Sequence, residues 1–264
     1  MQRLQLRLLL PLCFALLLQP LFGVTHASDR PIVAAASDLQ YALESVAERF
    51  EADTGKAVRL NFGSSGNFRR QIAQGAPFEL YLSADESYVT ALYDEGHLES
   101  EGVLYGIGRI VLMTRQEDAD WPDDKPLQHL AERLEADEIQ RFAIANPDHA
   151  PYGVAAREAL EHAGLWREIQ PRLIHGENVS QATRHALSSD VQGGIVAYSL
   201  ALAPELRERS AFVLIPEDYH APLRQRMALV NGAGETARAF YDYIQQKPAR
   251  ELLRDYGFDL PDSS

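Results

Sequence analysis

The chain has 264 residues, with 38 Asp and Glu against 25 Lys and Arg, and a formal net charge of −13. This acidic excess argues against a nucleic-acid binder and against a protein of anionic membrane surfaces, because both partners require clustered Lys and Arg. The apolar share of 46% and the charged share of 24% are ordinary for a folded protein, so we expect one large domain or two modest ones.

Residues 1–27 are typical of a secretory signal peptide that is cleaved. Arg3 and Arg7 give a positive start, residues 8–22 are almost wholly apolar, and Ala27 supplies the small residue at the end. A membrane anchor is disfavoured, because two prolines interrupt an apolar run of about 15 residues and about 20 are needed to cross a bilayer. We therefore expect an exported protein that does not stay in the membrane.

The single cysteine, Cys13, lies inside this segment. The mature chain is therefore predicted to contain no disulfide, no thiol nucleophile and no Cys-based metal site. Loss of residues 1–27 also removes two arginines, which leaves 23 basic residues and a formal charge of −15.

Short apolar runs alternate with amphipathic segments along the rest of the chain, and this alternation predicts an α/β protein with parallel sheets covered by helices on both faces. The apolar runs predict strands at 31–36, 58–62, 78–82, 106–114, 142–145, 194–197, 211–215 and 224–230. Helical spacing predicts helices at 39–50, 67–73, 84–95, 127–134, 152–162, 165–173, 180–187, 235–246 and 248–256.

Familiar catalytic and metal-binding patterns are missing from the sequence. It has neither a His-Glu-x-x-His zinc motif nor a phosphate-binding Walker loop. Residues 63–66 (Gly-Ser-Ser-Gly) fall one residue short of a nucleophile elbow, and the eight histidines show no ligand spacing. We therefore expect no catalytic residue, no cofactor and no enzyme activity.

Four short polar loops instead lie between strands and helices, at 34–38, 62–66, 146–153 and 177–180. In open α/β sheets, ligands bind beyond the carboxyl ends of the strands, where helix N-termini offer unpaired N–H groups to anions. Serine hydroxyls add donors, and glycines allow the backbone to approach closely. The loops together favour an anion-binding protein, although each alone also fits an ordinary helix cap or turn.

Several motifs follow one another in order along residues 31–258. They are IVAAAS at 32–37, FGSSGNF at 62–68, GAP at 75–77, LSAD at 82–85, PDHAPYG at 147–153, GIV at 194–196 and FYDY at 240–243. Together they resemble the motifs of the periplasmic molybdate-binding proteins of ABC transporters. The resemblance implies a two-lobed periplasmic binding protein fold of the second type, in which each lobe is a mainly parallel sheet flanked by helices and the ligand lies in the cleft between them.

The same resemblance implies how the chain is divided and where it works. Lobe 1 would hold residues 28–107 plus 223–264, and lobe 2 would hold residues 108–222, with crossings near 104–111 and 221–229. The protein would be a periplasmic monomer that delivers molybdate to an inner-membrane ABC transporter permease.

The resemblance also assigns ligand contacts to Ser37, Asp38, Ser65, Tyr152 and Val179. The two serines would donate their hydroxyls, and Val179 its backbone N–H. Tyr152 would donate its backbone N–H, with its ring hydroxyl as a further donor. Asp38 would give its backbone N–H and turn its carboxylate away, as an acid in a first helical turn. Molybdenum would enter only as the oxyanion, without a direct bond to a protein atom.

One position departs from the pattern of the family. Some members carry a ligand-binding tyrosine directly after Gly-Ile-Val, where this chain has Ala197. The next residue, Tyr198, is no substitute, because successive residues of a strand face opposite sides.

Molybdate is a tetrahedral dianion with hydrogen-bond acceptors only, so its site should present donors only. Each hydrogen bond to a charged ligand contributes about 1.5–3 kcal/mol, and five of them are consistent with micromolar to nanomolar binding. Tungstate, nearly the same in size and charge, should bind as well. The alternatives are a binding protein for another tetrahedral oxyanion or small solute, or an exported serine hydrolase that pairs Ser37 or Ser65 with a histidine.

Overall fold

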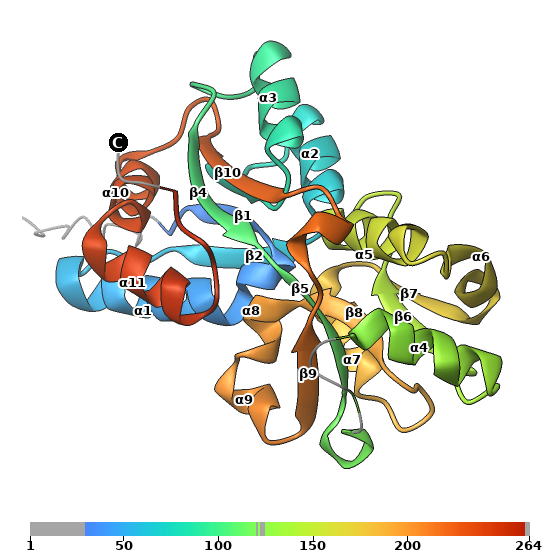
Figure 1. Cartoon of the computed structure of the whole chain (residues 1–264). Helices are drawn as coiled ribbons and strands as arrows, with labels where there is room; N and C mark the ends of the chain where they lie inside the picture. The colour runs from blue at the N-terminus through green and yellow to red at the C-terminus, as the bar shows by residue number, and fades with distance from the viewer. Residues whose placement is uncertain (1–29, 120, 122–124, 262–264) are drawn as a thin grey trace, which may run out of the picture.

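The computed structural model describes residues 30–119, 121 and 125–261, so the predicted signal peptide lies outside the described residues. The described chain forms two five-stranded sheets side by side, with strand orders β2-β1-β3-β10-β4 and β7-β6-β8-β5-β9 (Figure 1). The strands are β1 Ile32–Ala36, β2 Arg59–Gly63, β3 Leu80–Ser83, β4 Val103–Gly108, β5 Ile110–Arg115, β6 Phe142–Ala145, β7 Leu173–Gly176, β8 Gly194–Ala197, β9 Ser210–Leu214 and β10 Leu223–Leu229.

Helices cover both faces of the first sheet. One face packs on α1, α10 and α11, where the rings of Phe50 and Phe240 meet with centroids 5.0 Å apart, and the other face packs on α2 and α3. The helices are α1 Gln40–Thr54, α2 Ser65–Ala73, α3 Glu86–Asp94, α4 Pro126–Glu135, α5 Pro151–His162, α6 Trp166–Ile169, α7 Val179–Ala186, α8 Tyr198–Ala201, α9 Pro204–Arg207, α10 Glu235–Ile244 and α11 Lys247–Asp255, with 3-10 turns η1 Ser37–Leu39, η2 Gln116–Asp118, η3 Gln170–Arg172 and η4 Glu217–Tyr219.

Each sheet contains one strand that runs against its neighbours. In the first sheet β1 pairs in parallel with β2 and β3, whereas β10 is antiparallel to β3 and β4. The second sheet repeats the scheme with β5 as the antiparallel strand. The predicted two-lobed α/β fold with mainly parallel sheets is therefore confirmed.

The chain passes between the sheets twice. It leaves the first sheet at Gly108 and enters the second at Ile110, and it returns between β9 and β10. The single strand predicted at 106–114 is therefore wrong, because its residues belong to two strands in different sheets. A continuous apolar run cannot reveal such a change of sheet; the one charged residue in it, Arg109, lies at the crossing and forms an ion pair with Glu217.

The helix predicted at 165–173 is also wrong beyond Ile169. Pro171 lies in a 3-10 turn, and the chain then forms the edge strand β7, which pairs in parallel with β6. Proline cannot donate a backbone hydrogen bond inside a helix, and this short, partly exposed strand has too few residues to show a clear pattern. The two short helices α8 and α9 were not predicted either.

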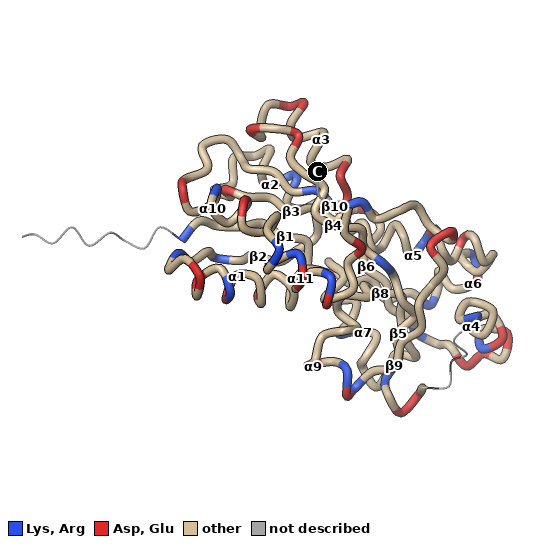
Figure 2. The backbone as a smooth tube through the Cα atoms, turned by 60° about the vertical axis from the view of Figure 1, so that its left-hand side comes forward, with Lys and Arg blue, Asp and Glu red and all other residues tan. Residues whose placement is uncertain are grey.

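Charged residues of both signs are interspersed over the two lobes, without a basic stripe along the described chain (Figure 2). Within the same residues, no helix combines the length and apolar character needed to cross a membrane.

Candidate functional site

The four polar loops of the sequence meet at one small cavity between the two sheets. Ser37 and Asp38 follow β1, Ser65 begins α2 after β2, Tyr152 lies in the first turn of α5 after β6, and Val179 begins α7 after β7. All five line this cavity, whose volume of about 10 Å³ leaves room for about one water molecule. Its remaining walls are formed by Ala36, Gly63, Ser64, Ala84, Ala150 and Pro151.

The two predicted serine donors have their acceptor sites occupied by backbone N–H groups. Ser37 Oγ accepts a hydrogen bond of 3.2 Å from the backbone N–H of Ser180, and Ser65 Oγ accepts one of 3.0 Å from that of Ala84. Both serines are buried. Each hydroxyl still has its own proton, so both serines can donate to a ligand in the cavity.

Hydrogen bonds join the lobes directly around the cavity. The backbone N–H of Gly66 donates to the carbonyl of His149 at 3.0 Å, and the His149 Nδ1 atom lies 3.0 Å from Ser64 Oγ. Gly66 must be glycine here, because a Cβ atom would lie 2.7 Å from that carbonyl oxygen. The structure is therefore in a closed arrangement, with the loops of one lobe seated on those of the other.

The carboxyl group of Asp38 is buried in the wall of the cavity, with 1% of the residue exposed. Its Oδ2 atom accepts hydrogen bonds from Tyr152 Oη at 3.0 Å and from Gln225 Nε2 at 2.8 Å, whereas Oδ1 has no hydrogen-bond partner among the described residues. Burial raises the pKa of Asp38 to about 6, although these hydrogen bonds act in the opposite direction. We expected the side chain to turn away from the ligand; its Oδ2 atom bonds to the buried Tyr152 and Gln225, and the residue lines the cavity.

Two further residues behind the cavity gave no signal in the sequence. Gln225 of β10 also donates to Tyr152 Oη at 3.0 Å and accepts a hydrogen bond of 2.7 Å from Tyr105 Oη of β4. Gln225 is completely buried beside a β-bulge. A glutamine in an alternating strand cannot be told from a solvent-facing one by pattern alone. This network joins η1 and α5 to β4 and β10, the two strands of the first sheet that lie next to the crossings of the chain.

Two polar residues near the motifs point elsewhere. Arg69, the one cation close to the loops in sequence, forms an ion pair with Glu95. Tyr198 begins α8, and its ring packs against Phe212 and the backbone of Gly257. Neither lines the cavity, and no Lys or Arg does.

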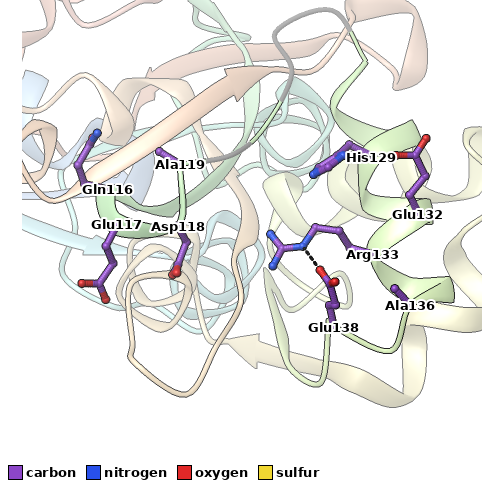
Figure 3. A pocket seen from close by; sticks show the side chains of 9 residues that line it. All are labelled: Gln116, Glu117, Asp118, Ala119, His129, Glu132, Arg133, Ala136 and Glu138. Atoms are coloured by element: carbon purple, nitrogen blue, oxygen red, sulfur yellow. Dashed lines mark hydrogen bonds and ion pairs between the residues drawn. The ribbon is translucent and has the colours of Figure 1, made fainter.

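A roomier cavity of about 520 Å³ lies in the second lobe and suits an anion poorly. Its walls include the carboxylates of Glu117, Asp118, Glu132 and Glu138, and its one arginine, Arg133, is paired with Glu138 (Figure 3). The described part of the chain contains no group of three or more His, Cys, Asp or Glu placed to hold a metal ion. The interlobe cavity therefore remains the better candidate site for an anion.

Known proteins share both the sequence and the fold. Residues 32–259 match the family described as bacterial extracellular solute-binding protein. The molybdate-binding protein ModA of Rhodobacter capsulatus is 33% identical over 235 residues (88% of this chain and 89% of that protein), and that of Azotobacter vinelandii is 30% identical over 231 residues (86% and 89%). The solved periplasmic molybdate-binding protein of A. vinelandii superposes with a TM-score of 0.79 at 28% identity, covering 88% of this chain and all of that one.

The family match spans nearly the whole described chain, and the solved relative has the same two-lobed architecture. The similarity found in the sequence motifs is thereby confirmed over both lobes. The chain belongs to the family of bacterial extracellular solute-binding proteins.

Proposed function

We propose that this chain binds molybdate, and also tungstate, in the periplasm and delivers it to an inner-membrane ABC transporter permease. The observation that carries the proposal is a buried cavity whose serine hydroxyls and helix-start N–H groups are donors, with no Lys or Arg in its walls. The molybdate-binding relatives, at 30–33% identity over most of the chain, support the choice of ion. The protein would act as a monomer, after cleavage of residues 1–27, and without a cofactor.

Neutral donors are sufficient to bind the oxyanion. The hydroxyls of Ser37 and Ser65 would each donate to one of its oxygens. The backbone N–H groups of Tyr152 and Val179 belong to the first turns of α5 and α7, where no intrahelical acceptor exists and the helix dipole favours negative charge. A fully deprotonated ion accepts all of these bonds, whereas the smaller sulfate would leave donors imperfectly paired.

Entry of the ion requires the lobes to separate. The closed cavity holds about one water, which is too little for a tetrahedral oxyanion with four oxygens. We assign residues 28–107 plus 223–264 to lobe 1 and residues 108–222 to lobe 2, so that opening occurs about the two crossings of the chain. The ion would then bridge the loops that contact one another in the closed structure.

Titration calorimetry with molybdate, tungstate, sulfate and phosphate tests the proposal, and native mass spectrometry gives the stoichiometry. We expect one molybdate or tungstate per monomer with micromolar or tighter affinity, and weaker binding of sulfate. Phosphate binding tighter than molybdate would overturn the assignment and favour a protein for another tetrahedral oxyanion.

One observation favours an exported serine hydrolase, although with Ser64 in place of the predicted Ser37 or Ser65. Ser64 Oγ lies 3.0 Å from His149 Nδ1, and the Nε2 atom of that histidine lies 3.5 Å from Glu177 Oε2. Against catalysis, Ser64 Oγ accepts the backbone N–H of Asn67 as a helix cap, and the Glu177 side chain is 73% exposed. We therefore propose binding without turnover. Hydrolysis of p-nitrophenyl acetate or phosphate that disappears in Ser64→Ala would support the hydrolase instead.

A further inference from the structure

We propose that Asp38 shares a proton with the bound oxyanion, so that the binding of a dianion takes up one proton from the solvent. The inference rests on the proposed function and deepens it. It makes Asp38 a ligand-binding group through its carboxyl oxygen, in addition to the backbone N–H expected from the sequence.

The geometry holds the carboxyl group in place at the cavity. Tyr152 Oη and Gln225 Nε2 both donate to Oδ2, and these donors come from α5 and β10. The group therefore cannot leave the wall without breaking two buried hydrogen bonds. Its other oxygen, Oδ1, is buried and has no hydrogen-bond partner among the described residues. Buried polar atoms without a partner are rare in folded proteins, and each one needs an explanation.

A fully deprotonated oxyanion offers no hydrogen for Oδ1. Two acceptors brought together in a buried cavity repel each other unless a proton lies between them. A proton on Oδ1 removes this conflict, because the neutral carboxyl group then donates to an oxygen of the ion. The cavity would thereby become a site of donors only, as the ligand requires.

No cation offsets the charge of Asp38. The groups that act on its carboxylate are Tyr152 of α5, Gln225 of β10 and Tyr105 of β4, together with the backbone N–H groups of Asp38 and Leu39, which lower its pKa. Burial raises the pKa of both tyrosines well above 10, so both stay neutral. Ser199 of α8 donates to its backbone carbonyl.

The other elements packed against η1 do not supply a compensating charge. From α7, the backbone N–H of Ser180 donates to the Ser37 hydroxyl. The charged groups Glu44 of α1 and Arg184 of α7 act on the pKa of Tyr41, which burial raises first of all. Strand β2 ends at Gly63, where the polar turn of residues 63–66 begins. Repulsion between the carboxylate and a dianion would therefore remain uncompensated.

The proton balance is simple. Burial already raises the pKa of Asp38 to about 6 without a ligand, and a neighbouring dianion raises it further. At pH values between the pKa of Asp38 in the free protein and its pKa in the complex, a proton moves from the buffer onto Oδ1 as the ion binds. The proton returns to the buffer on release. The affinity for molybdate should then fall up to about tenfold per pH unit above about pH 6.

The test is titration calorimetry with sodium molybdate from about pH 6 to 8.5, in pairs of buffers that differ in ionisation enthalpy. The dependence of the apparent enthalpy on that of the buffer gives the number of protons taken up. Wild-type protein should take up about one proton per ion near pH 7.5 and less near pH 6. Asp38→Asn cannot gain a proton, so it should take up none, and its affinity should not vary with pH. Asp94→Asn, at an exposed position of α3, is the matched control and should behave as wild type.

The outcomes separate this inference from the proposed function. Molybdate binding by the wild type with no proton uptake and a constant affinity over this range would overturn the role of Asp38 and leave the proposed function standing. Uptake that persists unchanged in Asp38→Asn would overturn it as well. A failure of the wild type to bind molybdate would overturn both proposals. Should Asp38→Asn not fold, the uptake measured on the wild type decides.

Discussion

The hydroxyl of Tyr152 donates a hydrogen bond of 3.0 Å to the carboxylate of Asp38, although the two residues are 114 positions apart and follow strands of different sheets. The amide of Gln225, from the strand to which the chain returns after its second crossing, bonds to both of them. The buried side chains of Asp38, Tyr152 and Gln225 therefore link the closure of the lobes to the charge in the cavity and to the strands at the crossings.

The charge on Asp38 should destabilise the folded protein at neutral pH. Burial raises the pKa of the Asp38 carboxyl group from 3.8 to about 6, so folding favours its neutral form. The free energy of unfolding therefore falls as the pH rises through about 6. A shift of about two units corresponds to roughly 3 kcal/mol at pH 8. Denaturant unfolding should show Asp38→Asn to be more stable than wild type at pH 8, with a gain that shrinks toward pH 4. An equal difference at both pH values would contradict the prediction.

Gly108 should be required for the buried network. A Cβ atom there would clash with Tyr152 Oη and lie 2.7 Å from Gln225 Nε2. Gly108→Ala should therefore weaken molybdate binding at least tenfold, because the closed arrangement must shift. Gly106→Ala is the control: its Cβ atom would lie 3.4 Å or more from the ring of Phe258, so binding measured by calorimetry should change little. Equal affinities for the two variants would remove Gly108 from the closing mechanism.

Ser65→Ala should weaken both binding and folding. Loss of one hydroxyl donor to a charged ligand corresponds to about 1.5–3 kcal/mol, or roughly 10- to 100-fold in the dissociation constant. The variant also leaves the N–H of Ala84 without its acceptor, which lowers the free energy of unfolding by about 1–3 kcal/mol. Calorimetry and denaturant unfolding measure the two effects, and Ser87→Ala, at an exposed position of α3, is the control. Unchanged affinity would exclude Ser65 from the site.

His149→Ala should accelerate release of the ligand. The ring of His149 bonds to Ser64 across the cleft, and a neutral hydrogen bond contributes about 0.5–1.5 kcal/mol, so the dissociation rate should rise about two- to tenfold. Stopped-flow displacement measures this rate. His175→Ala, at an exposed position of β7, should leave it unchanged. A slower release from His149→Ala would show that the contact does not hold the lobes together.

The association rate should not fall as salt is added. The mature chain is expected to carry a formal charge of −15, and the ligand is a dianion, so the overall field opposes capture and salt screens it. Stopped-flow association at low and high ionic strength should give equal or faster rates at high salt. A steep decrease would indicate a basic patch that attracts the ion.

The amino-acid sequence determined the fold class and the position of the site loops. Apolar runs and helical spacing are local properties, so the order of most strands and helices follows from them directly. The resemblance of the motifs at 32–37, 62–68 and 147–153 to a known family implied the roles of Ser37, Ser65 and Tyr152, because local pattern alone cannot distinguish these residues from ordinary helix caps and turns.

The tertiary structure alone decided everything that depends on residues meeting across the two sheets. The division of 106–114 into β4 and β5 cannot be predicted from a local pattern, because apolar residues continue on both sides of Arg109 and a single charged residue does not mark a change of sheet. The partners of Asp38 come from α5 and β10, and a carboxylate looks the same in sequence whether it faces water or a buried glutamine. The sequence therefore supplied the donors of the site. Only the packing of distant segments decided that Asp38 is buried, has one oxygen without a partner among the described residues, and is able to hold a proton.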